Sequence, residues 1–317
     1  MMPIKMTIRK AVPEDIPAIV VLLQQSLGES LIKKSDTSWN FKHVDNPFGE
    51  SHVLLAYHGD VLVGVRAFMK WQWQKGTQFW TAYRAVDTAT HPDFQGKGIF
   101  KKLTLQALDD IQKEGETFVF NTPNEISRPG YLKMGWKVVD PIELAVIPTP
   151  FYFFSLFFNY PKRTNTISTT QLDWICTLYS TELSKTDCLF TPKTAAYLKW
   201  RYEYNPLQDY VVFSSNDWYL ALYVKKHRFF NELRVVETIS SNPKKFNTQM
   251  QNAIVRFAFQ KKCGLITTSN KDLFGCKIYG KFGPKLTIKT LTQDSFFTHS
   301  VYTIKKWCYS LGDLELF

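Results

Sequence analysis

Two glycines flanking a lysine, in the run Gln95-Gly96-Lys97-Gly98, are the residues whose types and spacing point most directly to chemistry. They separate a strand-like stretch, 78–90, from a helix-like stretch, 99–114. Glycine tolerates the backbone angles that bring successive N–H groups close to a ligand, and a new helix adds unpaired N–H groups and the positive end of its dipole. The spacing predicts a cradle for a phosphate or diphosphate, with a loop that merely turns the chain as the alternative.

A second group of candidate residues follows downstream, where Asn124, Ser127 and Tyr131 precede Gly135-Trp136. The phenol of a tyrosine has a pKa of about 10 and can act as a proton donor. Asn124 can hydrogen-bond a ligand or the start of a helix. The alternatives are core packing for Tyr131 and a turn for Asn124.

The elements that must position these residues alternate between strands and helices. Strand patterns lie at 5–11, 51–57, 61–71, 78–90, 117–121 and 136–147, and helical patterns follow Asp15 and cover 35–44, 99–114 and part of 124–134. Asp15 is the expected cap of the first helix. The order predicts an α/β (α+β) domain in which helices flank a mixed, mostly antiparallel sheet.

This order and these residues resemble the GNAT superfamily of N-acetyltransferases over roughly residues 5 to 145. The acyl-CoA motif of that family, Q/R-x-x-G-x-G/A between a strand and a helix, is similar to Gln95 through Phe100. The departure is Phe100, which stands where the family has Gly or Ala and would crowd the first helical turn. A second family motif, N-x-x-A-x-x-x-Y followed by G-F, resembles the run from Asn124 to Trp136.

The resemblance implies acyl-CoA as co-substrate and no metal. It implies that the diphosphate lies on the backbone of Gln95, Gly96, Lys97, Gly98 and Ile99, with lysines adding positive charge. The strand before the turn would carry a bulge that frees backbone groups of Ala89 and Thr90 for the pantetheine arm. Asn124 and Ser127 complete the expected cofactor contacts.

The same resemblance assigns Tyr131 the role of the acid that protonates the departing thiolate. No residue pattern in the sequence identifies a general base. Asp87 on the preceding strand is our candidate, acting directly or through water, and Glu125 and His91 are also near in sequence. Each of the three could equally be a solvated or capping residue.

The second half of the chain echoes the first. Arg84-Ala-Val-Asp-Thr88 is similar to Arg234-Val-Val-Glu-Thr238, Tyr131-Leu-Lys-Met-Gly135 to Tyr279-Gly-Lys-Phe-Gly283, and Trp39 with Asn46-Pro47 to Trp200 with Asn205-Pro206. The second half again reads strand, helix (246–262), strand (265–269), short helix. It has no glycine where the first half has its turn, so we expect a degenerate GNAT-like domain that walls the substrate groove. An unrelated α/β domain is the alternative.

Length and composition fit this organisation. The 317 residues suit two domains, which we predict as 1–147 and 169–317 with a linker at 148–168. The five cysteines form no C-x-x-C pair, and the start of the chain lacks the apolar run of a signal peptide, so we expect a cytoplasmic protein. The apolar stretch 151–160 is too short to span a membrane and permits at most peripheral contact.

Three functions remain open at this point. The first is an acyl-CoA-dependent N-acyltransferase, most simply an acetyltransferase acting on a primary amine of a small molecule or an amino sugar. The second is an aminoacyl or peptidyl transferase of the tandem-GNAT type, whose donor is an aminoacyl-tRNA. The third is a non-catalytic module that binds acyl-CoA or another anion, which the net charge of +11 allows. No nucleic-acid-binding motif is present, so we expect no nucleic-acid partner, and the sequence does not indicate an oligomeric state.

Overall fold

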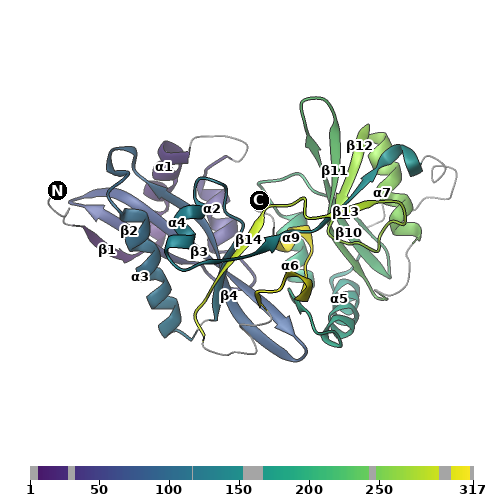
Figure 1. The fold of residues 1–317 in the computed structure, drawn as a ribbon, viewed down its shortest axis with the longest axis horizontal. Helices are drawn as coiled ribbons and strands as arrows, with labels where there is room; N and C mark the ends of the chain where they lie inside the picture. The colour runs from purple at the N-terminus through teal and green to yellow at the C-terminus, as the bar shows by residue number, and fades with distance from the viewer. Residues whose placement is uncertain are drawn as a thin grey trace.

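The computed structural model describes residues 6–27, 33–115, 117–152, 167–242, 248–292 and 301–314. These residues form two mixed sheets that lie side by side (Figure 1). The first sheet runs, in spatial order, β1 (Thr7–Lys10), β2 (His52–His58), β3 (Val61–Lys75), β4 (Gln78–Thr90), β5 (Phe118–Asn121), β14 (Lys285–Thr290) and β6 (Lys137–Pro141). This arrangement confirms the α+β fold class predicted from the sequence.

Helices cover both faces of the first sheet because its strands alternate apolar residues toward each face. On β2, Leu55 packs in a core that includes α1 (Ile16–Leu27) and α2 (Asp36–His43), whereas Leu54 packs in another with α3 (Ile99–Lys113) and α4 (Arg128–Lys133). Gly64 of β3 lets α3 approach closely, since a Cβ there would lie 2.6 Å from Cγ2 of Ile99. The helix that follows the glycine turn is therefore held directly on the sheet.

Strands β4 and β5 separate partway along their length. They pair in parallel only from Ala82–Phe118 to Arg84–Phe120, while β4 continues to Thr90 alongside β3. We call the divergence beyond Arg84 the β4–β5 fork. The β3–β4 ladder also shifts register between Arg66 and Ala67, so Asp87 is the extra residue of a β-bulge and has a φ of 33°.

The second sheet repeats these features. Its order is β13 (Ile278–Gly280), β7 (Leu144–Pro148), β12 (Cys263–Thr268), β11 (Asn231–Ser240), β10 (Trp218–Lys226) and β9 (Val211–Ser214), with α7 (Thr248–Gln260) packed against it. Strands β11 and β12 pair in parallel only as far as Val235–Thr268. The β10–β11 ladder shifts register at Ala221, as β3–β4 does at Arg66. A shared fork and a shared bulge are consistent with duplication.

The two sheets exchange strands. β7, from the first half of the chain, lies between β13 and β12, and β14, from the second half, lies between β5 and β6. Figure 1 shows the yellow-green β14 reaching into the blue first lobe and the teal β7 reaching into the second. The division at 147 and 169 remains a prediction, but the sheets do not follow it. Much of the predicted linker, from 153 to 166, lies outside the described residues.

Three local expectations differ from the structure. The predicted strand 136–147 is two strands, β6 and β7, which belong to different sheets. Tyr279, matched by sequence to Tyr131 and expected in a short helix, lies on the edge strand β13 and donates its hydroxyl to Glu143. Asp15 ends the short helix η1 (Pro13–Asp15) and pairs with Arg9 instead of capping α1. In each case tertiary pairing overrides the local pattern.

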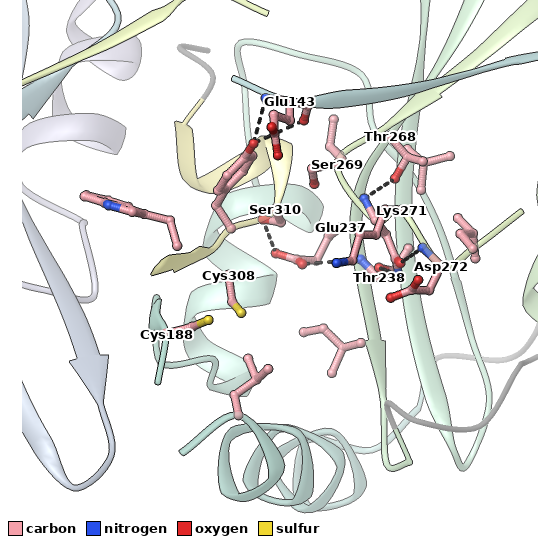
Figure 2. Close-up of a pocket in the computed structure, with 18 of the residues that line it drawn as sticks. Glu143, Cys188, Glu237, Thr238, Thr268, Ser269, Lys271, Asp272, Cys308 and Ser310 are labelled. Carbon is pink, nitrogen blue, oxygen red and sulfur yellow. Dashed lines mark hydrogen bonds between the residues drawn. The ribbon is translucent and has the colours of Figure 1, made fainter. Parts of the chain in front are cut away.

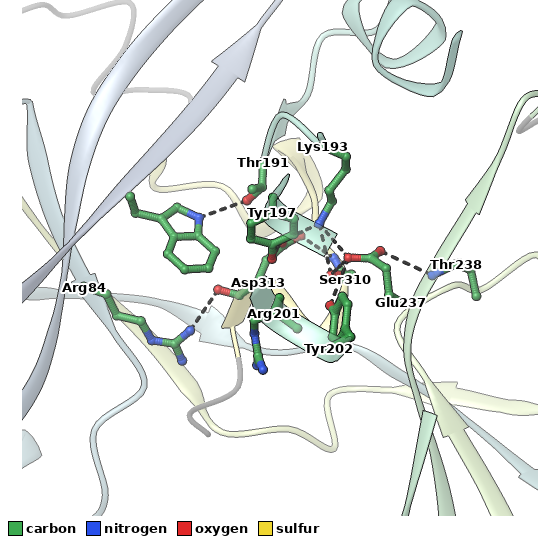
Figure 3. Close-up of polar contacts among 12 residues, drawn as sticks. Arg84, Thr191, Lys193, Tyr197, Arg201, Tyr202, Glu237, Thr238, Ser310 and Asp313 are labelled. Carbon is green, nitrogen blue, oxygen red and sulfur yellow. Dashed lines mark hydrogen bonds and ion pairs between the residues drawn. The ribbon is translucent and has the colours of Figure 1, made fainter. Parts of the chain in front are cut away.

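The segment between the sheets contains a buried polar network. The elements around this network are α5 (Thr169–Ser184), β8 (Leu189–Phe190), α6 (Ala195–Leu198), the π-helical turn η4 (Lys199–Glu203), η5 (Ile304–Lys306), β15 (Trp307–Cys308) and α9 (Leu311–Leu314). The short strands β8 and β15 pair with each other, and β8 also pairs with β3, so both belong to the first sheet. Lys193 donates to Glu237 of β11 at 2.7 Å and to Asp313 of α9 at 2.6 Å (Figure 3). All three side chains are buried, so the network joins the second sheet to the C-terminal segment. None of the described helices is long and apolar enough to cross a membrane.

Candidate active site

The glycine turn is open and exposed. It follows the short helix η2 (Pro92–Phe94), and Gly96 and Gly98 have φ angles of 73° and 78°. Apart from the adjacent residues in the chain, no described residue has a heavy atom within 4 Å of the place where a Cβ would stand at either glycine. Among the described residues, the N–H groups of Gly96, Lys97 and Gly98 have no hydrogen-bond partner. The turn thus presents unpaired amides at the positive end of α3, as an anion cradle requires.

The side chains of the turn contact other parts of the protein. Lys97 bends back, with its Nζ 2.9 Å from the carbonyl oxygen of Asp93 and 4.4 Å from the centroid of the Phe94 ring. Gln95 reaches the carbonyl oxygen of Thr90 at 3.5 Å. Ile99 is buried under Gly64. Backbone amides, not lysine side chains, are therefore the main polar groups of the turn in this structure.

Phe100 does not fill the turn. Its ring packs edge-on against Tyr131, with 5.5 Å between ring centroids and an interplanar angle of 89°. A Cβ at Gly130 would lie 3.2 Å from the edge of the same ring. The residue that departs from the family pattern is therefore a wall beside Tyr131, and the glycine cradle stays open.

The strand edge next to the turn fits the expected pantetheine contacts in part. The amide of His91 donates to Val63 at 3.0 Å, so by the alternation of an antiparallel ladder the N–H of Ala89 faces β3 and that of Thr90 faces the opposite side. Beyond the β4–β5 fork, β5 does not pair with this part of β4. The carbonyl oxygen of Thr90 accepts a hydrogen bond from Ser26 at 3.0 Å.

Asn124 and Ser127 are joined by hydrogen bonds. The side-chain oxygen of Asn124 accepts from the amide of Ser127 at 2.8 Å and from its hydroxyl at 2.9 Å. Ser127 stands at the N-cap position of α4 but does not cap it with its side chain. The pair therefore forms the turn that leads into α4 and so places Tyr131.

Tyr131 is buried between α4 and the sheet. It is 5% exposed and its ring also packs on Trp136. Its hydroxyl lies 2.9 Å from Nη1 of Arg66, a fully buried residue of β3. The same Nη1 contacts the hydroxyl of Thr88 on β4. The candidate acid thus stands beside the bulged part of β4, on the face that carries α3.

Asp87 lies against one cation, Lys42, and the ring of His43. Its carboxylate accepts hydrogen bonds from Lys42 and, at 2.9 Å, from Nε2 of His43, and the Asp87 side chain is 9% exposed. Burial would raise the pKa of Asp87, but the charge of Lys42 and the hydrogen bond from His43 outweigh it and hold that pKa well below its usual range. A carboxylate in this state accepts a further proton poorly.

The other two candidates for a base are engaged elsewhere. Glu125 pairs with Arg128 on the surface of α4. The ring of His91 accepts from the amide of Asp93 at 3.3 Å and packs near Phe94. Among the described residues, no group of three or more His, Cys, Asp or Glu side chains is placed to hold a metal ion.

A separate cavity of about 860 Å³ lies in the second half of the chain (Figure 2). Its walls include β11 from its last pair with β12, at Val235, to Ser240, the residues from Thr268 at the end of β12 to Leu273, and Cys188 and Cys308. It therefore occupies the counterpart of the β4–β5 fork. None of the site residues predicted from the sequence lines it.

The structure thus brings the turn 95–98, the end of β4 and Tyr131 to one region. It adds residues that the sequence reading missed, namely Arg66, Lys42 and His43. Arg66 left one trace in the sequence, since it is the only charged residue in the otherwise largely apolar run from Val61 to Met69. Lys42 and His43 left none, because charged residues at the end of a helix are ordinarily solvated.

Comparison with known proteins agrees with this geometry. Residues 7–139 match the family model described as an acetyltransferase (GNAT) domain, which confirms the resemblance noted in the sequence. No curated protein sequence matches the chain.

Solved structures match over most of the chain. A GCN5-related N-acetyltransferase from Anabaena variabilis has 15% identity, covers 91% of this chain and 73% of its own, and gives a TM-score of 0.64. A probable N-acyltransferase from Enterococcus faecalis, described as a conserved protein of unknown function, has 11% identity, coverage of 92% and 74%, and a TM-score of 0.65. Eis1 from Mycobacterium abscessus has 11% identity, coverage of 94% and 76%, and a TM-score of 0.56. At such identities the likeness concerns the fold, and it includes the second half.

Proposed function

Because residues 7–139 form an acetyltransferase domain of the GNAT family, we propose that the chain is an acyl-CoA-dependent N-acyltransferase. The acyl group is most simply acetyl, and the acceptor is a primary amine of a small molecule or an amino sugar. The proposal rests on one geometric observation. The open glycine turn and buried Tyr131 lie on the same side of β4, where that strand has separated from β5.

The cofactor would be held mainly by backbone groups. The diphosphate of CoA would accept hydrogen bonds from the amides of Gly96, Lys97 and Gly98, which have no other partner among the described residues. The pantetheine arm would follow β4 into the β4–β5 fork, with the amide of Thr90 facing it and Ala89 beside it. Asn124 and Ser127 would contribute by fixing the turn before α4.

The reaction would be a direct attack of the amine nitrogen on the thioester carbonyl carbon. A bond forms between nitrogen and carbon, the bond between carbon and sulfur breaks, and the sulfur leaves with the electron pair. Tyr131 would transfer its hydroxyl proton to that sulfur, while the nitrogen loses a proton. Holding the amine and the thioester together contributes several kcal/mol of the rate enhancement on its own.

The amine nitrogen must lose a proton as it attacks, so the reaction needs a base. Asp87 remains the candidate from the sequence, and it lies on the bulge at which the thioester would bind. Because Asp87 already pairs with Lys42 and His43, its contacts support the role of a counter-ion that keeps Lys42 buried, in place of the role of a general base. The amine proton would then leave through water.

The second half of the chain would wall the acceptor groove. Its Trp200 donates to the carbonyl oxygen of Phe41 in α2 at 2.8 Å, and the two rings stack 5.1 Å apart. The second half therefore supports α2, which carries Lys42 and His43, beside the bulge of β4.

A screen of amines with acetyl-CoA, read by release of the CoA thiol, tests the proposal. Amine-dependent thiol release supports it. Acetyl-CoA binding without turnover on any amine would favour a non-catalytic module instead. In the active protein, Tyr131→Phe should lower kcat by about 100-fold or more while the affinity for acetyl-CoA is kept. Tyr219→Phe, which removes another buried hydroxyl in the second sheet, is the control and should leave kcat unchanged.

A further inference from the structure

Arg66 is a buried cation that has no counter-ion among the residues that the structure describes. It is fully buried, and among the described residues it forms no ion pair, while its Nε and Nη2 have no hydrogen-bond partner. Three aromatic rings surround the guanidinium, those of Phe68, Phe100 and Tyr131, with centroids 4.4, 5.5 and 5.3 Å from Cζ. Phe100, the residue that departs from the family pattern, thus helps to enclose Arg66.

Such an arrangement costs the folded protein free energy. A charge removed from water is strongly unfavourable unless an opposite charge or a full set of hydrogen bonds compensates it. The aromatic faces offset part of this cost, and the hydroxyls of Thr88 and Tyr131 satisfy one nitrogen. Stability alone would favour an apolar side chain at this position, so the cation points to a use in the reaction.

The contact between Arg66 and Tyr131 has a fixed polarity. A guanidinium only donates hydrogen bonds, so the hydroxyl oxygen of Tyr131 must accept from Nη1 of Arg66. The proton of Tyr131 is then directed elsewhere, and no described residue accepts it. When Tyr131 gives up that proton, the phenolate oxygen is left 2.9 Å from the positive charge of Arg66.

We propose that Arg66 is the positioning residue of the acid, which directs the proton of Tyr131 toward the departing sulfur and stabilises the phenolate that remains. The inference rests on the proposed function. As the bond between carbon and sulfur breaks, the sulfur takes the electron pair and then the proton of Tyr131, and the negative charge moves to the phenolate oxygen. Water returns a proton to Tyr131 after the products leave.

A double-mutant cycle with Arg66→Met and Tyr131→Phe tests this role. In the wild-type background, Arg66→Met should lower kcat by about 10- to 100-fold, as expected for loss of a charge-assisted hydrogen bond. The KM for acetyl-CoA should stay unchanged. In the Tyr131→Phe background, the same substitution should change kcat by no more than about twofold, because the group through which Arg66 acts is already gone. Arg66→Lys should recover part of the lost kcat.

The Tm of thermal unfolding distinguishes the proposed role from a structural one. A structural role of Arg66 predicts a lower Tm on substitution, and the proposed role does not. Arg66→Met replaces an unpaired charge with an apolar side chain, so Tm should stay the same or rise. Arg201→Met is the control, since Arg201 is equally buried but donates to the carbonyl oxygen of Gly312 and to Tyr210. Its loss should lower Tm.

The outcomes are separable. If the wild-type protein releases thiol with an amine but Arg66→Met has an unchanged kcat, or loses the same factor with and without Tyr131, the role of Arg66 is wrong and the proposed function stands. A lower Tm for Arg66→Met with a parallel loss in both backgrounds would make Arg66 structural. A wild-type protein that does not bind acetyl-CoA would overturn the proposed function and this inference together.

Discussion

Arg84 of β4 donates a hydrogen bond from Nη1 to the carbonyl oxygen of Asp313, which lies 2.9 Å away and 229 positions later in the chain. The carboxylate of Asp313 accepts in turn from Lys193 at 2.6 Å and from Tyr197 at 3.0 Å (Figure 3). One residue near the C-terminus therefore links the first sheet, at the start of the β4–β5 fork, to the buried network between the sheets.

The first prediction concerns Lys193, whose single positive charge pairs with the side chains of both Glu237 and Asp313. Burial alone would lower the pKa of Lys193, but Asp313 and Glu237 outweigh it and raise that pKa, so the ammonium stays charged. Lys193→Met leaves two buried carboxylates without a cation and should lower the free energy of unfolding by about 3–5 kcal/mol. Urea unfolding measures this loss.

Lys185→Met is the control for this change. Lys185 pairs with Glu182 on the surface, where its side chain is 61% exposed. An exposed pair contributes about 0–1 kcal/mol, so this variant should unfold close to the wild-type urea concentration. Equal losses in the two variants would show that the buried network does not hold the molecule together.

The second prediction concerns pH. Burial lowers the pKa of His43 from the usual value of 6.5, although the neighbouring Asp87 acts against the shift. Below about pH 6.5 the unfolded chain therefore takes up a proton at this position that the folded chain does not. Stability should fall as pH drops from that value, until the pH reaches the lowered pKa of the folded state.

His43→Gln removes this contribution and tests the prediction. The loss in free energy of unfolding between pH 7 and pH 5 should be smaller in the variant than in the wild type. Denaturant titrations at the two pH values give the difference directly. An unchanged pH dependence in the variant would mean that His43 takes up its proton in the folded state as easily as in the unfolded one.

The third prediction separates two roles for Asp87. The pKa of its carboxylate is held low in the folded state, so its stabilising effect is present at neutral pH and is lost only as pH falls through that low pKa. Asp87→Asn uncouples the buried Lys42 and should lower the free energy of unfolding at pH 7 by about 3 kcal/mol. If Asp87 is only a counter-ion, Asp87→Asn should lower kcat by less than about tenfold.

Comparing unfolding with the pH profile of kcat decides between the roles. A loss of about 100-fold or more in kcat, together with loss of the acidic limb of the profile, would instead establish Asp87 as the general base. That result would set aside the counter-ion role proposed here.

The region around the glycine turn could be predicted from the sequence because its signals are local. The span of β4 and the start of α3 follow from periodicity and from the glycines that separate them, and the structure gives Gln78–Thr90 and Ile99–Lys113. The fork and bulge were expected only through the family resemblance, since no residue pattern in β4 encodes its distance from β5.

The rest could not be predicted because it depends on distant partners. The pattern of 144–148 indicates a strand but not the sheet to which that strand belongs. The exchange of β7 and β14 between the sheets therefore could not be predicted from the local sequence. Arg66 is a single charged residue in an apolar run, and only the packing of Phe68, Phe100 and Tyr131 around it shows which groups enclose it. The match of Tyr279 to Tyr131 failed because β7 pairs with β13 and draws Tyr279 into a strand.

The central claim is that the glycine turn at the start of α3 binds the diphosphate of acyl-CoA. Calorimetric titration of acetyl-CoA into wild-type protein, Gly98→Trp and Gly115→Trp tests it most directly. Both glycines have a positive φ, 78° and 84°, and open space where a Cβ would stand, at opposite ends of α3, so the two substitutions cause similar strain. We expect wild-type protein and Gly115→Trp to bind acetyl-CoA with similar affinity, whereas Gly98→Trp should not bind it. Absence of binding to the wild type, or unchanged binding to Gly98→Trp, would contradict the central claim.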